Sequence, residues 1–264
     1  MIVWGWAGIA HAVDVSGAWQ LTAEGSFPVG LELVDRVGVP TEAVAYDVDL
    51  TVICEADRGD HVCVVGDVAV SLRGRRPEHD EALRLLVDGV LPSFPGRVVR
   101  LVRAGDGAVR VVRWAEPASP LTLNAHRNDL AMGAVLDRAL APLDLVVDDG
   151  SGARAWLSRR ERSVLVPPVF DRLGVVEVRH VATPLGADER VETRATARWS
   201  DPEASTTGCD VVVVGVAVVA PSPDGEPTLL RRSITLDGVL DRPMEPGVPF
   251  VQSARAERQP KRTE

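Results

Sequence analysis

The segment that decides the fold covers residues 44–54 and reads VAYDVDLTVIC. Apolar side chains occupy every second position from Val44 to Cys54, and Asp47, Asp49 and Thr51 lie among the positions between them. This period of two is typical of a strand with one face in a core and the other in water. Similar patterns recur along the chain and predict strands over residues 17–23, 44–54, 62–72, 98–102, 109–114, 145–147, 175–181, 191–199, 211–219 and 229–236. The unbroken apolar run at 211–219 further predicts a strand buried on both faces.

Two segments have helical spacing instead. The clearer one covers residues 129–141, with Asn128 as its predicted cap and Pro142 as its stop. A second helix is predicted over residues 78–87. The apolar stripe of the first should lie on a sheet, and it consists of Met132, Val135, Leu136, Ala139 and Leu140.

Turn-forming Gly and Asp residues separate the strands at 105–107, 148–152 and 221–225, which favours antiparallel hairpins. The sequence therefore predicts a mainly β protein, β-rich α+β, with two accessory helices. Its antiparallel sheets are expected to form a sandwich or a barrel-like sheet with a helix packed against it.

With 264 residues, the chain is long enough for one large β domain or two smaller ones. A faint internal repeat, in which residues 113–117 (RWAEP) echo residues 198–202 (RWSDP), favours two related lobes, and chance similarity is the alternative. The predicted divisions are a signal segment at 1–12, a β-rich lobe at 13–117, a second β-rich lobe with the 129–141 helix at 118–252, and a disordered polar tail at 253–264.

The N-terminal apolar run closes on Ala10-His11-Ala12, which fits a small-x-small cleavage site. No basic residue precedes the run, so a buried N-terminal strand is the alternative interpretation. The pattern favours export, and it predicts a soluble, periplasmic or secreted protein whose mature chain begins near Val13. The apolar run at 209–220 is too short to cross a bilayer, so no membrane span is expected in the mature chain.

The three cysteines, Cys54, Cys63 and Cys209, allow one disulfide and leave one thiol. A bridge between Cys54 and Cys63, across a hairpin, would suit an oxidising compartment. If these two lay directly opposite, the apolar face of 44–54 would meet Val65, Asp67, Ala69 and Ser71, so a β-bulge is needed to bring the faces together. The alternative is that the three cysteines form no bridge and are simply small, buried hydrophobic residues.

Charge argues against a nucleic-acid partner. The net charge is −9, and the 29 basic residues are almost all arginines scattered along the chain. Binding a phosphate backbone needs a concentrated basic surface, which this pattern does not provide.

No residue pattern predicts a catalytic, cofactor or metal site. Gly-x-Ser-x-Gly, Walker and Gly-x-Gly-x-x-Gly sequences do not occur. The histidines at 11, 61, 79, 126 and 180 lack the spacing of paired metal ligands and are interpreted as surface or turn residues. Asp47 and Asp49 are interpreted as a solvated strand face, and Arg58-Gly59-Asp60 as a turn.

Tryptophans near strand ends are the candidate lining of a ligand cavity between sheet and helix, although the same parts build an ordinary core. They are Trp19, Trp114, Trp156 and Trp199. Gly17-Ala18-Trp19 resembles the Gly-x-Trp of lipocalins, whose fold is a closed barrel around an apolar ligand. The resemblance covers three residues, and no second lipocalin motif accompanies it.

The sequence thus favours a non-enzymatic, exported binding module with no cofactor, whose partner is an apolar or amphipathic small molecule or an envelope protein. Two alternatives stay open. One is a structural or protein-interaction β domain. The other is an exported hydrolase with dispersed residues, for which His126 and His180 beside an acid are the candidates.

Overall fold

The computed structural model describes residues 11–27, 44–74, 77–103, 110–115, 123–143, 146–147, 174–200, 208–221, 227–241 and 247–260. The elements in these ranges are β1 (His11–Ala12), β2 (Gly17–Phe27), β3 (Val44–Asp57), β4 (Asp60–Arg73), α1 (Pro77–Val90), the 3-10 turn η1 (Leu91–Ser93), β5 (Val98–Arg103), β6 (Arg110–Trp114), α2 (Leu123–Leu140), the 3-10 turn η2 (Ala141–Leu143), β7 (Val146–Val147), β8 (Gly174–Leu185), β9 (Asp188–Ser200), β10 (Gly208–Ala220), β11 (Thr228–Asp241) and β12 (Val248–Arg258).

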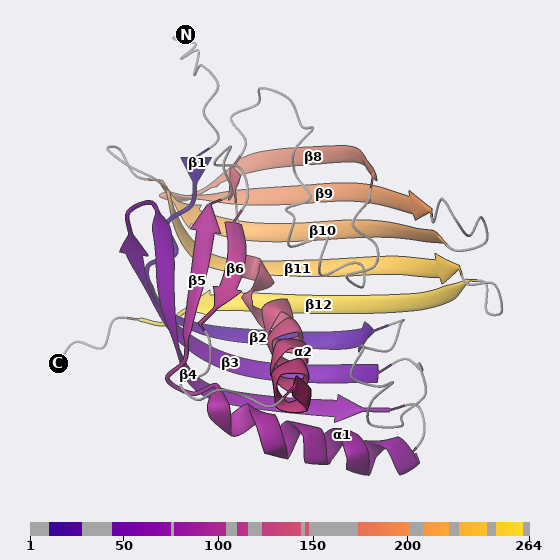
Figure 1. The fold of residues 1–264 in the computed structure, drawn as a ribbon. Coiled ribbons are helices and arrows are strands. Elements are labelled where there is room, and N and C mark those ends of the chain that lie inside the picture. The colour runs from indigo at the N-terminus through magenta and orange to yellow at the C-terminus, as the bar shows by residue number, and fades with distance from the viewer. Residues whose placement is uncertain are drawn as a thin grey trace, which may run out of the picture.

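Ten of these strands form one antiparallel sheet, in the order β6-β5-β4-β3-β2-β12-β11-β10-β9-β8. Figure 1 shows that β5 and β6 stand across the direction of β8–β12, so the sheet curls, and α2 lies on the inside of the curl. Helix α2 contacts β2, β3 and β12, and α1 contacts β4. The predicted class, mainly β with two helices, is confirmed. The arrangement is an open curled sheet and not a closed barrel of the lipocalin kind.

Strands from both halves of the chain lie in this single sheet, because β2 pairs with β12 from Gly25↔Gln252 to Trp19↔Arg258. The two hairpins that contain the internal repeat, β5–β6 and β8–β9, lie at opposite edges of the sheet. Division of the chain at residue 117 and its origin by duplication stay predictions.

The predicted disordered tail is wrong over residues 253–258, which belong to β12. The buried residues Gln252, Ala254 and Ala256 alternate there with more exposed neighbours such as Arg255. Two alanines and a glutamine make a weak apolar stripe, which a charged composition hides in the sequence. The strand forms because β2 and β11 supply hydrogen-bonding partners on both sides.

The β3–β4 hairpin contains the bulge that the cysteine argument requires. Cys54 and Cys63 lie directly opposite, with their Cα atoms 4.0 Å apart, and form a disulfide. Between Leu50↔Val68 and Val52↔Val65 the register shifts, so Gly66 and Asp67 together oppose Thr51. The Asp67 N–H donates to Thr51 Oγ1 at 2.7 Å.

This bulge exchanges the two faces of β4. On one side of it Leu72 is buried, and on the other side Cys63 and Val65 are buried. If the alternation continued from Leu72 without a bulge, Val64 would be buried, but it is 43% exposed. Arg58 and Gly59 form the hairpin turn, with φ of 52° and 92°, as a two-residue turn of this kind requires.

Helix α2 buries its predicted stripe completely, since Met132, Val135, Leu136, Ala139 and Leu140 have no exposed surface. The predicted cap at Asn128 is wrong, because the helix begins at Leu123. Asp129, expected near the first turn, instead accepts from Arg97 in a buried ion pair. Strand β10 is fully buried on one face only, because Val214 on the other face is 43% exposed.

Candidate functional site

Trp19 and Trp114 serve as parts of the core. Trp19 is 1% exposed, and its Nε1 donates to the Val15 carbonyl at 2.8 Å. Trp114 is half-buried; its Nε1 donates to Asp137 at 2.9 Å, and its ring meets Phe94 edge-on. Neither lines the cavity or the hollow described next. Trp156 lies outside the described residues, and Trp199 is in β9 with its side chain also outside the description.

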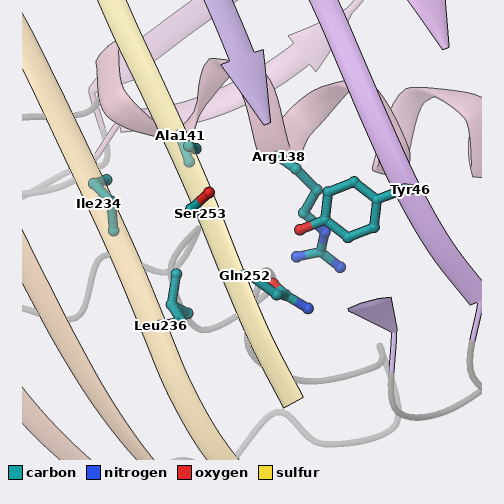
Figure 2. A pocket seen from close by; sticks show the side chains of 8 residues that line it. Tyr46, Arg138, Ala141, Ile234, Leu236, Gln252 and Ser253 are labelled. Carbon is teal, nitrogen blue, oxygen red and sulfur yellow. The ribbon is translucent and has the colours of Figure 1, made fainter. Parts of the chain in front are cut away.

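A small cavity lies between the C-terminal end of α2 and the sheet (Figure 2). It holds about 10 Å³, which is enough for one water-sized group. Its apolar walls come from η2, β11 and β12, and its polar groups from three different elements. The lining residues are Tyr46, Arg138, Ala141, Ile234, Leu236, Gln252, Ser253 and Ala254.

The amide of Gln252 is oriented by one hydrogen bond. Its Nε2 donates to the Ser26 carbonyl at 3.0 Å, so the amide oxygen is the group left for the interior. Gln252 is 2% exposed, and Oε1 has no hydrogen-bond partner in the part of the chain that the structure describes. An acceptor buried in this way is unusual, because burial without a donor costs free energy.

A surface hollow of about 290 Å³ adjoins the cavity and shares Tyr46 and Ser253 with it. The other lining residues are Glu24, Gly25, Ala45, Asp47, Arg73 and Val251. A Cβ on Gly25 would lie 2.7 Å from the Val251 carbonyl and 3.0 Å from the Tyr46 hydroxyl. Glycine at this position therefore lets the Tyr46 hydroxyl approach the strand closely.

Burial and two neighbouring charges act on the pKa of Tyr46. Burial raises its pKa to about 12; the positive charge of Arg138 opposes this, and the negative charge of Glu24 adds to it. The phenol is therefore protonated and neutral at physiological pH. In Figure 2 its hydroxyl points toward the Arg138 guanidinium.

Tyr46 is the single tyrosine of the chain, so its titration can be measured directly. We expect the phenolate absorbance of the folded protein to rise with a midpoint near 12, and that of the urea-unfolded protein near 10. Because the unfolded state releases the proton first, stability should fall as pH rises above about 10. A folded-state midpoint near 10 would contradict the buried position.

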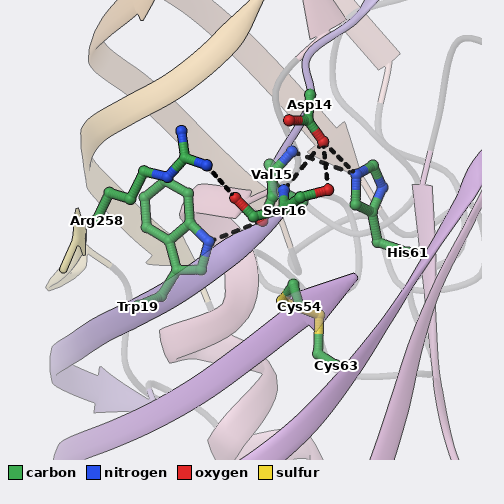
Figure 3. A network of polar contacts seen from close by, with 8 residues as sticks. All are labelled: Asp14, Val15, Ser16, Trp19, Cys54, His61, Cys63 and Arg258. Atoms are coloured by element: carbon green, nitrogen blue, oxygen red, sulfur yellow. Dashed lines mark hydrogen bonds and ion pairs between the residues drawn. A yellow bond between two sulfur atoms is a disulfide. The ribbon is translucent and has the colours of Figure 1, made fainter. Parts of the chain in front are cut away.

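A second polar cluster fixes the N-terminal segment (Figure 3). His61 Nε2 lies 3.0 Å from Asp14 Oδ1, and the same oxygen accepts from Ser16 Oγ at 2.6 Å and Ser16 N at 3.0 Å. Asp14 N–H also donates to the Pro227 carbonyl at 2.8 Å. The segment is thus held between β4 and the start of β11, with Val13 and Val15 in the core.

This cluster brings together a carboxylate, an imidazole and a hydroxyl, but in an order unlike that of a serine triad. Asp14 contacts both His61 and Ser16, whereas a triad needs the imidazole to reach the hydroxyl. The arrangement is therefore suited to anchoring. The prediction of a surface or turn position is wrong for His61 and His79, which are 2% and 8% exposed.

The pKa of Asp14 gives this anchor a measurable signature. Burial, the largest single influence, raises the pKa, but the Ser16 and His61 hydrogen bonds together outweigh it, so the pKa is below its ordinary value. Asp14 then adds stability that is fully present above about pH 4 and is lost as pH falls through its lowered pKa.

We expect the Asp14→Asn variant to lose part of the acid sensitivity of the wild type. Urea unfolding at pH 7 and near pH 3 measures it, and the difference between the two midpoints should be smaller in the variant. Parallel losses of stability in the two proteins would contradict the role of the ionised carboxylate.

The two histidines proposed for a hydrolase, His126 and His180, lie on different elements. His126 is exposed on α2, and His180 is in β8 with its side chain outside the description. Across the described ranges, no group of three His, Cys, Asp or Glu residues is arranged to hold a metal ion. No described helix has the length and apolar character that a membrane crossing requires.

The sequence did not predict that Tyr46, Arg138 and Gln252 lie around one cavity. The weak signals were a phenol on an otherwise aliphatic strand face and an arginine three residues after Val135 in the helix stripe. Gln252 gave no signal, because its strand was not predicted.

Comparisons with known proteins add little. No protein-family model matches the chain, and no curated protein matches it. A solved structure titled "Lipid-protein interactions in lipovitellin" is similar in fold with a TM-score of 0.45 and 8% identity, over 92% of this chain. The chain spans 24% of that protein's length. At this TM-score the likeness carries no argument about a ligand.

Proposed function

We propose that the protein is a non-enzymatic, exported binding module for a small apolar or amphipathic ligand, held where α2 ends on the sheet. The observation that carries the proposal is the apolar cavity between α2, η2 and strands β11–β12, which has Tyr46, Arg138 and Gln252 among its surrounding residues. Small-molecule sites commonly combine apolar walls with a few placed polar groups.

The size of the site sets which space could hold most of a ligand. The cavity alone admits a single small group, whereas the hollow, at about 290 Å³, is close to the lower end of the range for ligand pockets. The apolar part of a ligand in the hollow would lie beside Val251, which is 52% exposed.

Binding can be tested by native mass spectrometry and by displacement of a fluorescent alkyl probe. We expect a folded-only excess mass, or micromolar probe binding, and a loss of about tenfold in affinity for Leu236→Phe, which fills the cavity. Leu130→Phe is the matched control, because Leu130 is on α2 but 60% exposed. Equal affinities in the two variants, or no binding by the wild type, would sink the proposal.

Export is supported by the Ala10-His11-Ala12 pattern and by the Cys54–Cys63 disulfide, since such bonds persist in oxidising compartments. The test is the mass and location of the protein expressed with residues 1–12. Ala12→Leu should block processing because the position before the cut must be small, and His11→Leu should not. An intact N-terminus and free thiols on Cys54 and Cys63 would count against export.

A structural or protein-interaction domain and an exported hydrolase remain the alternative predictions. If the wild type binds no probe, the result would favour the structural or protein-interaction domain. Hydrolysis that depends on His126 or His180 would support the second.

A further inference from the structure

We propose that strand β8 pairs with β8 of a second copy of this chain, antiparallel and centred on Val178, so that the two sheets continue into one. This surface is separate from the proposed ligand site, because the residues that line the cavity and the hollow lie outside β8. The proposal therefore stands or falls independently of ligand binding.

The position of β8 in the sheet supplies the first step. It is the last strand in the sheet order, and among the described strands it pairs with β9 alone. Figure 1 shows it as the outermost of the strands β8–β12. With 12 residues it is also far longer than β6, the 5-residue strand at the other edge. A long edge strand presents backbone N–H and C=O groups with which a further strand can pair.

The charges along β8 supply the second step. In the register of β8 with β9, Glu177 lies opposite Thr196 and Arg179 lies opposite Arg194. Arg194 is exposed, so these positions belong to the solvent face of the sheet. Two arginines directly opposite each other on one face repel. A carboxylate on the other side of Arg179 would offset this repulsion.

A second β8 brings such a carboxylate in one two-fold register. Antiparallel pairing that continues a sheet matches residues of the same face, so the two-fold axis must pass through a residue. When the axis passes through Val178, Glu177 of each copy lies opposite Arg179 of the other, and symmetry makes two opposite-charge pairs. An axis through Glu177 or Arg179 would instead set like charges opposite each other. Opposite charges across strands stabilise the pairing and fix its register.

Two features confine the pairing to the middle of β8. The register with β9 shifts between Val175 and Glu177, and Pro184, near the end of the strand, has no N–H to donate. Neither feature lies between the two charge pairs, so residues 177–179 stay able to pair in both copies. Because the ladder is short, the dimer should be of the weak, transient class, with a Kd in the micromolar range.

Sedimentation of the full chain at neutral pH, from about 1 to 200 micromolar, tests the association. We expect the mass to rise with concentration from that of a monomer toward that of a dimer. Glu177→Arg sets arginine opposite arginine at both charge pairs and should weaken the association about tenfold or more. Glu177→Arg combined with Arg179→Glu restores both pairs with their signs exchanged, so it should recover the wild-type association.

Glu189→Arg is the matched control. It makes the same change in net charge at an exposed residue of β9, opposite Pro184 and Val219, and should leave the association unchanged. If Glu177→Arg does not fold, hydrogen exchange on the wild type still decides. The backbone amides of β8 should exchange more slowly at the highest concentration than at the lowest, and those of the interior strand β10 should not change.

A monomer at every concentration would overturn the proposal. A dimer that Glu177→Arg leaves intact, or that Glu189→Arg weakens equally, would overturn it as well, because the interface would then lie elsewhere. Amides of β8 that are equally protected at both concentrations would mean that another segment covers this edge, and this result would also count against pairing with a second copy.

Discussion

Replacing Arg97 with alanine should lower the free energy of unfolding by about 3–5 kcal/mol. Arg97 Nη1 and Nη2 donate to the two carboxylate oxygens of Asp129 at 2.6 and 2.9 Å, and both side chains are at most 8% exposed. Arg97 Nε also donates to the Ala115 carbonyl at 2.7 Å, and the guanidinium lies 4.8 Å from the Phe94 ring centre. Its removal leaves the Asp129 carboxylate buried without its cation, which is the costly case for an ion pair.

Urea unfolding of Arg97→Ala and Arg84→Ala tests this. Arg84 pairs with Glu81 and Asp88 on the exposed side of α1, so its loss should leave the free energy of unfolding nearly unchanged. The double variant Arg97→Met, Asp129→Leu should recover much of the lost stability, because no buried charge remains. Equal effects of Arg97→Ala and Arg84→Ala would show that the buried pair does not hold α2 to β5 and β6.

Trp19→Ala should also cost about 3–5 kcal/mol in the free energy of unfolding. The indole is 1% exposed, belongs to the main core, and donates to the Val15 carbonyl, so its loss leaves both a cavity and an unsatisfied carbonyl. The measurement is again urea unfolding, with Trp19→Phe expected to lose less because the ring volume is partly kept.

Ile53→Ala is the control for this variant. Ile53 lies on the adjacent strand β3 and is 59% exposed, so its truncation should change stability by no more than about 0.5 kcal/mol. If Trp19 lined a ligand site instead of the core, Trp19→Ala would cost little stability and would change probe binding. The two readouts together therefore decide the role of Trp19.

Local patterns predicted most of the elements. The alternation at residues 44–54 and 191–199 gave strands, and the stripe from Met132 to Leu140 gave a helix that lies on a sheet. The facing cysteines required a bulge, and the register shift beside Thr51 confirms it. These features depend on residues within one hairpin or one helix, where spacing along the chain sets geometry.

The sequence by itself determined the fold class, the hairpins and the buried face of α2, because burial of apolar side chains at periods of two and near 3.6 is a local property. Tertiary structure alone decided that residues 248–258 form a central strand, since its weak stripe is held by β2 and β11 on either side. It also decided the burial of His61 and the meeting of Tyr46, Arg138 and Gln252, which come from β3, α2 and β12. Those three are far apart in sequence, and only the curl of the sheet around α2 brings them to one cavity.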